Sequence, residues 1–177
     1  MARCYSDAVP RLKPLPNIWL LSDARNDAVL ERALQRLPRG SGFVFRHYHL
    51  PEPERRARFA GLARIAKARG IRVILSGPAA KARHWGADGS YGAHRHATLA
   101  TAHSMCELRR ASRAAGIMLS PVFPTRSHPG GKVLGPLRFR LLARRSPVPV
   151  IALGGMSSAA NRRLKWPRWA AIDAFLR

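Results

Sequence analysis

The chain has 177 residues, of which 46 % are hydrophobic, with 14 glycines and 14 prolines. This composition argues against a disordered or fibrous protein and fits one domain with a single core. The balance of 32 Lys and Arg against 9 Asp and Glu gives a formal net charge of +23, which attracts polyanions without regard to their sequence.

The cations lie scattered along the sequence, without a zinc-finger spacing or an RNA-binding aromatic motif. We therefore expect nucleic acid to be bound only nonspecifically, and interpret most arginines as a solvated surface. The two cysteines, Cys4 and Cys106, argue against a disulfide framework and fit a reducing compartment. Apolar stretches of signal-peptide or membrane-span length are absent, so we expect a cytoplasmic protein with no membrane partner.

Short apolar runs alternate along the chain with longer segments of helical period, a pattern typical of βαβ units around a parallel sheet. Residues 26–37 and 51–70 repeat apolar side chains at steps of three and four, as helices that cover a sheet do. The predicted strands span residues 17–22, 42–46, 71–76, 87–91, 98–102, 116–120, 148–153 and 170–175.

Eight β/α repeats predict an α/β fold, a small TIM (β/α)8 barrel with its last helix truncated, because only Leu176 and Arg177 follow the eighth predicted strand. The wall beside that strand would then expose apolar side chains unless a partner covered them. A doubly wound open sheet is the alternative fold. We assign residues 1–16 to an N-terminal extension and residues 17–177 to a single domain.

Two loops after consecutive predicted strands carry groups that bind anions. Glycines without a Cβ let backbone amides approach an anion, and a helix starting near Ser157 adds its positive end. The loops after strands seven and eight of such barrels often bind phosphate. The alternative is that the glycines only turn the chain. The candidate groups are Thr125, Arg126, Ser127, His128 and Lys132 after the sixth strand, and Gly154, Gly155 and Ser157 after the seventh.

Several segments resemble thiamine phosphate synthase and its relative TenI, the thiazole tautomerase. The segment "PVFPTRSHPGGKVLGPLRFRLLARRSPVPVIALGGMS" (121–157) resembles the sixth and seventh β/α units of that family, and "IWLLSD" (18–23), "ADG" (87–89) and "TAHSMCEL" (101–108) agree in order. The resemblance implies a TIM barrel that binds a phosphorylated thiazole at its mouth, and hence a phosphorylated small molecule as the partner.

The resemblance is closer at the positions where the family binds thiazole phosphate than at the positions where it binds magnesium and pyrophosphate. Ser76 and Gly77 replace the family's Asn-Asp pair, and residues 93–96 replace its Gly-Gln-x-Asp. Of the family's Gln-Leu-Arg-x-Lys pyrophosphate contacts, only Arg46 survives among residues 44–48. We therefore expect no resident metal or cofactor, with magnesium required only if the chain is a true synthase.

The tautomerase moves protons without a metal, and His103 matches the position of the histidine that it uses. Imidazole suits this task because its pKa near neutrality lets it accept and donate a proton. We interpret His103 as the catalytic residue, the alternative being a structural hydrogen bond or a helix cap. Two rival functions remain: a genuine synthase with an altered magnesium site, and a catalytically inactive barrel that binds phosphorylated ligands or polyanions.

Other polar and aromatic residues near strand ends receive ordinary interpretations. We expect Asp23 and Asp173 to pair with arginines and Asp88, early in the fourth strand, to be structural. The histidine pairs 47/49 and 94/96 share a face and could hold zinc, but polar mouth residues are the preferred interpretation. Trp166 and Trp169 are expected to pack around the truncated end, or else to form a homodimer contact.

Overall fold

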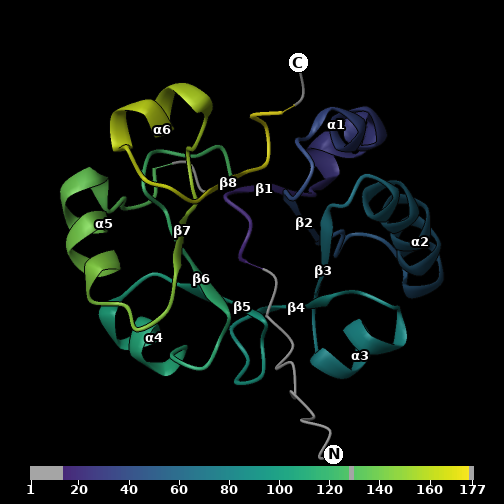
Figure 1. The fold of residues 1–177 in the computed structure, drawn as a ribbon, viewed down its shortest axis with the longest axis horizontal. Coiled ribbons are helices and arrows are strands. Elements are labelled where there is room, and N and C mark those ends of the chain that lie inside the picture. Colours follow the sequence, from purple (N-terminus) through teal and green to yellow (C-terminus); the bar gives the residue numbers. More distant parts are fainter. Residues whose placement is uncertain (1–13, 128–129, 176–177) are drawn as a thin grey trace, which may run out of the picture.

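Eight parallel strands close into a barrel in the computed structural model, which describes residues 14–127 and 130–175 (Figure 1). Each strand pairs with the next, and β1 closes the ring on β8 with Trp19 opposite Ala170. The predicted TIM-like α/β barrel is confirmed, and closure rules out the doubly wound open sheet. The strands are β1 (Ile18–Leu21), β2 (Gly42–Phe45), β3 (Arg72–Ser76), β4 (Gly89–Gly92), β5 (Leu99–Ala102), β6 (Gly116–Leu119), β7 (Val150–Ala152) and β8 (Trp169–Ala171).

The helices surround the strand ring, each packing its apolar side against it (Figure 1). Pro51 precedes α2 and Ser104 caps α4, where its hydroxyl accepts from the backbone N–H of Glu107. In the described chain, none of the helices has the length and apolar character needed to cross a bilayer. The helical elements are the 3-10 helix η1 (Ala24–Val29), α1 (Leu30–Arg36), α2 (Glu52–Ala68), α3 (Ala79–His84), α4 (Met105–Arg110), α5 (Gly135–Arg144) and α6 (Ser158–Leu164).

The connection between β4 and β5 has no helix, so the predicted repeat of eight β/α units is wrong at this point. Residues 93–98 form a loop that returns the chain within six residues, although parallel strands usually need a crossover of about a dozen or more. The short crossover works because these strands share only two paired positions, Tyr91 with Leu99 and Gly92 with Ala100. Helix α3 packs beside β4 and α4 packs beside β5, so a helix still covers each of the two strands that this loop joins.

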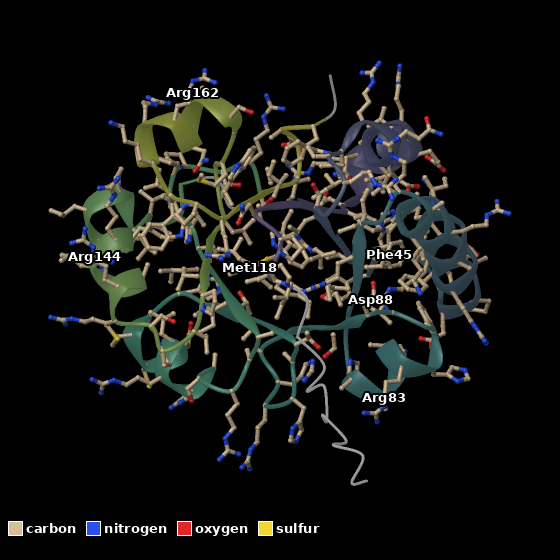
Figure 2. All side chains as sticks on the ribbon, viewed as in Figure 1. Phe45, Arg83, Asp88, Met118, Arg144 and Arg162 are labelled. Atoms are coloured by element: carbon tan, nitrogen blue, oxygen red, sulfur yellow. The ribbon has the colours of Figure 1, made fainter. Side chains whose placement is uncertain are left out.

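Side chains that alternate along the strands fill the barrel interior, and Trp19 is the largest of them. A Cβ on Gly42 would lie 2.1 Å from the Trp19 ring, so only glycine fits opposite it. Met118 lies toward the centre of the strand ring, whereas Phe45 packs between strands and helices (Figure 2). Leu15 closes the amino-terminal end of the barrel, which places part of the assigned extension against the core.

Phe175 covers the wall where an eighth helix would lie in a complete barrel. Residues 172–175 form a turn, and the Phe175 ring lies 5.1 Å from the Trp169 ring, centroid to centroid. Phe175 and Ile18 both pack against the two clusters of buried side chains that lie between the strand ring and the helices. Trp169 is therefore 6 % exposed, and the expectation of an exposed apolar wall beside β8 is wrong, because the chain covers it with its own residues.

Candidate functional site

The loops after β6, β7 and β8 enclose a cavity of about 530 Å³ at the carboxyl-terminal mouth of the barrel. The candidate residues Thr125, Ser127, Gly154 and Gly155 all line it, so the structure brings these two loops together as the sequence predicted. His128 lies outside the described residues. The lining residues are Arg25, Pro124, Thr125, Arg126, Ser127, Leu153, Gly154, Gly155, Met156, Ala171, Ile172 and Asp173.

The two glycines are required by the close approach of the β6 and β7 loops. The backbone N–H of Phe123 donates to the carbonyl of Gly154 over 3.1 Å. Gly154 and Gly155 have φ values of 90° and 62°, in the region that disfavours other residues. A Cβ on Gly155 would lie 2.4 Å from the carbonyl oxygen of Pro124. These glycines therefore turn the chain and also admit a second backbone.

Backbone N–H groups without an acceptor lie in the β7 loop. Within the described residues, the N–H groups of Gly154, Gly155 and Met156 donate no hydrogen bond. The side chain of Ser157 accepts from the N–H of Ala160 at 3.1 Å and so caps α6, and Ser157 does not line the cavity. Consecutive N–H groups in such turns form concave sites that favour anions. The predicted helix start near Ser157 is confirmed, since Ser157 is the N-cap of α6.

Arg25 extends its guanidinium across the cavity, a residue that our sequence reasoning missed. Its Nη2 donates to Ser127 Oγ at 2.9 Å, its Nε donates to Asp23 at 2.8 Å, and its Nη1 lies 4.0 Å from Asp173. The expected arginine pairing of both aspartates is thus confirmed. A local sequence pattern could not predict the contact between Arg25 and Ser127, because the two residues are 102 positions apart. The position of Arg25 two residues after Asp23, just after β1, was the available signal.

Arg25 also controls the ionisation of Asp23. Partial burial acts to raise the pKa of Asp23, but hydrogen bonds and charge from Arg25 outweigh it and hold this pKa below its ordinary value. The same hydrogen bond raises the pKa of Arg25. Near neutral pH the wall therefore presents an ion pair whose guanidinium retains contacts toward Ser127.

Arg46 is held on the opposite side of the mouth by its own backbone. Its N–H donates to Ser22 Oγ at 2.7 Å, and its carbonyl accepts from Arg55 Nε at 3.0 Å. Arg55 also donates to the carbonyl of Ser76 at 2.7 Å, and its guanidinium lies over the rings of Phe45, Tyr48 and Trp85. Arg55 thus fixes the loops after β2 and β3, and with them the position of Arg46.

The places where the resemblance locates magnesium ligands hold no pair of carboxylates. Ser76 Oγ bonds to the hydroxyl of Tyr48, and the His94 ring bonds to the carbonyl of Gly77 at 2.9 Å. Across the residues that the structure describes, no group of three or more His, Cys, Asp or Glu is placed to hold a metal ion. The donors present are hydroxyl, carbonyl and imidazole groups, which do not match the oxygen-rich, charged set that magnesium prefers.

His103 lies at the end of β5, as predicted, but it lines a different cavity. Its Nδ1 lies 2.9 Å from the carbonyl of Ser120, to which it donates, so Nε2 carries the lone pair. Its cavity, of about 580 Å³, lies beside the loop that lacks a helix. Thr125, Ser127 and the two glycines do not line this cavity, so the proposed proton-transfer residue and the predicted phosphate groups face separate spaces.

A buried chain of hydrogen bonds links residues at the ends of β1 and β2 to η1, and no sequence pattern indicated it. Ser22 Oγ donates to His47 Nδ1 at 2.8 Å, and His47 Nε2 donates to Asp27 at 2.8 Å. Burial lowers the pKa of His47, and the charges of His49 and Arg58 act in the same direction, outweighing Asp27. Ser22 is fully buried and His47 is 1 % exposed, so this serine–histidine–aspartate arrangement is structural and has no access to a substrate.

The other histidine pairs are not assembled as a zinc site. The rings of His47 and His49 lie 5.1 Å apart, centroid to centroid, but His47 is already held by Ser22 and Asp27. His94 faces Gly77. The interpretation as polar groups around the mouth is therefore wrong for His47, which is buried and held by Ser22 and Asp27.

Comparison with known proteins gives matches at the level of structure. No protein-family model matches the chain, and no curated protein matches its sequence. Thiamine phosphate pyrophosphorylase from Pyrococcus furiosus matches with a TM-score of 0.75 and 19 % identity over 92 % of this chain and 87 % of that one. The citrate synthase SbnG matches with a TM-score of 0.60 and 10 % identity over 90 % and 87 %. The chain therefore shares its barrel fold with thiamine phosphate pyrophosphorylase.

Proposed function

We propose that the chain binds a phosphorylated small molecule, a phosphorylated thiazole, in the cavity between the β6 and β7 loops, and acts in the thiazole branch of thiamine metabolism. The observation that carries this proposal is the row of three backbone N–H groups, Gly154 to Met156, that have no acceptor among the described residues. Arg25 and Arg126 line the same cavity and supply positive charge. The sequence resemblance supplies the identity of the ligand.

The chemistry of these groups suits a phosphate monoester. Backbone amides donate to phosphate oxygens, and hydroxyls such as Thr125 and Ser127 add directed hydrogen bonds. Asp173 would repel an anion, but it lies 4.0 Å from Arg25, which offsets its charge. An incoming phosphate would compete with Ser127 for the Arg25 guanidinium, so binding exchanges one hydrogen bond for a stronger charged one.

Binding is tested by calorimetric titration with a phosphorylated thiazole and with the same thiazole lacking phosphate. We expect only the phosphorylated form to bind, and Arg126→Gln to weaken it roughly tenfold, since one charged hydrogen bond is worth about 1.5–3 kcal/mol. The matched control is Arg162→Gln on α6, which removes an equal charge away from the cavity. Equal binding of both thiazoles, or an equal loss in both variants, would contradict the proposal.

We propose further that His103 transfers protons on the bound ring in a tautomerase-like reaction. Its Nδ1 donates a hydrogen bond to the carbonyl of Ser120, so Nε2 is the ring nitrogen that could accept a proton, as a general base must. The ligand would have to extend from the phosphate cavity to the separate cavity that His103 lines.

Solvent-hydrogen exchange into the thiazole, followed by NMR, separates catalysis from binding. We expect His103→Gln to abolish exchange while titration still shows binding, and His96→Gln, at an exposed loop position, to leave both unchanged. Binding without exchange in the unaltered protein would favour the inactive barrel. Pyrophosphate turnover that stops when magnesium is removed would favour a synthase.

A further inference from the structure

The second half of the chain contains a long basic stretch without carboxylates. Between Leu108 and Ile172 the sequence holds 11 Arg and 2 Lys but no Asp or Glu. Those residues include all of α5 and α6 and the end of α4, three helices that follow one another along one side of the barrel (Figure 1). Arg144 and Arg162 extend outward from α5 and α6 at the periphery of the molecule (Figure 2).

Exposed apolar side chains gather on the middle helix of this side. Leu137 is 74 % exposed and Leu141 is 54 % exposed, one turn apart on α5, and Val133 just before the helix is 38 % exposed. Seven residues make about two turns, so Arg144 lies on the same outward face as Leu137. Phe139, two residues after Leu137, is fully buried against the barrel. The outward face of α5 therefore exposes leucine side chains with an arginine side chain beside them.

This combination selects among the anionic partners that a basic surface attracts. Nucleic acid supplies phosphates but offers little to two projecting leucines. A second copy of the same surface would bring uncompensated cations together. The bilayer interface supplies both requirements, since it buries leucine at the level of the acyl chains while anionic headgroups pair with flanking arginines.

We infer that the outer surface of α4, α5 and α6 docks on an anionic lipid bilayer, with Leu137 and Leu141 entering the interface. This contact is peripheral and needs no membrane-spanning segment. It replaces our expectation from the sequence that the protein has no membrane partner. The surface lies on the outer wall of the barrel rather than at its mouth, so the inference does not depend on the proposed function. A convex wall touches a plane along one line, which places α5 at the centre of the contact.

Vesicle sedimentation tests the docking with the full chain. We expect binding to vesicles in which about one third of the lipid is phosphatidylglycerol and none to phosphatidylcholine alone, since each cation near an anionic surface adds to the affinity. Leu137→Ser with Leu141→Ser should weaken binding about tenfold or more, because these side chains would no longer be buried in the interface. Circular dichroism checks that this variant stays folded.

Matched charge variants separate docking from bulk attraction. Arg138→Gln with Arg144→Gln on α5 and Arg56→Gln with Arg64→Gln on α2 remove equal charge from exposed positions. We expect the α5 pair to weaken vesicle binding several-fold more than the α2 pair, because only α5 lies at the contact. Equal losses in the two pairs, or no loss from the leucine variant, would overturn the inference.

An environment-sensitive dye distinguishes lipid from other polyanions. The dye is attached to Leu137→Cys in a chain that also carries Cys4→Ser and Cys106→Ser. We expect its emission to shift to the blue with phosphatidylglycerol vesicles but not with duplex RNA or polyglutamate, because only a bilayer removes the dye from water. A shift of equal size with polyglutamate would replace the lipid by an acidic protein partner.

Discussion

Single residues decide whether the mouth loops can meet, and Gly155 is the clearest case. Its backbone has a φ of 62°, and a Cβ would meet the carbonyl of Pro124 at 2.4 Å. Glycine is thus needed twice at one position, for the turn and for the contact. The neighbouring N–H groups keep their direction toward the cavity only while this contact is intact.

Gly155→Ala is expected to weaken binding of a phosphorylated thiazole about tenfold or more, because relieving the clash moves the amides that would bind phosphate. Calorimetric titration measures the loss. Gly40→Ala is the matched control, since Gly40 has a φ of 78° but nothing within 4 Å of an added Cβ. If both variants bind equally well, the β7 loop is not the anion site.

His47 links residue chemistry to pH-dependent stability. Its pKa is lowered in the folded protein, so the unfolded chain binds this proton more readily. Its contribution to stability is complete above the unfolded pKa of about 6.5 and is lost progressively as the pH falls from that value through the lower pKa of the folded state. Asp23, Asp27 and Glu31 are among the carboxyl groups whose pKa values are lowered, and they lose their contributions at more acidic pH.

His47→Asn is expected to reduce the free energy of unfolding by about 1–3 kcal/mol at neutral pH, since it removes buried hydrogen bonds to Ser22 and Asp27. Asparagine tolerates the φ of 37° at this position. Urea unfolding between pH 7.5 and 5.5 should also show a smaller dependence on pH in the variant. An unchanged pH dependence would mean that another group titrates in this range.

At the scale of elements, the barrel dispenses with helices where other groups cover the strands. The β4–β5 connection has only a loop, and a turn ending in Phe175 covers the wall beside β8. Trp169 is buried within a cluster of apolar side chains against which Phe175 packs.

Phe175→Ala is expected to lower the free energy of unfolding by about 2–4 kcal/mol, since it exposes Trp169 and Ile18. Thermal unfolding followed by circular dichroism measures the change. Phe175→Leu, which keeps most of the apolar volume, should recover much of it. A negligible effect of alanine would show that Phe175 does not replace the helix.

At the scale of the whole molecule, charge and fold serve separate purposes. The core is built from uncharged side chains, and the arginines lie mostly at the surface, where they set what the protein attracts rather than how it folds. The stretch between Leu108 and Ile172 carries 13 cations and no carboxylate, so no acidic side chain in it offsets that attraction.

Binding to duplex nucleic acid is expected to be weak, independent of sequence, and to fall about tenfold or more between low and physiological salt, since it rests on counterion release. Fluorescence anisotropy with two unrelated duplexes at several salt concentrations measures both properties. A preference for one duplex that persists at high salt would show specific recognition.

The sequence by itself determined the number and order of the eight strands, because each buried strand is a short apolar run that can be recognised locally. It overextended the eighth strand, which was predicted over residues 170–175 but spans Trp169–Ala171, with a turn over residues 172–175. It also placed His103 at a strand end and the glycines and hydroxyls in two mouth loops. Only the tertiary structure decided which of these groups share a cavity, because that depends on closure of the ring and on side-chain direction. Arg25 donates a hydrogen bond to Ser127, 102 residues further along the chain, and His103 lines a cavity that the two glycines do not line. Neither relation has a local signature, since each is fixed by packing between segments that are distant in the chain.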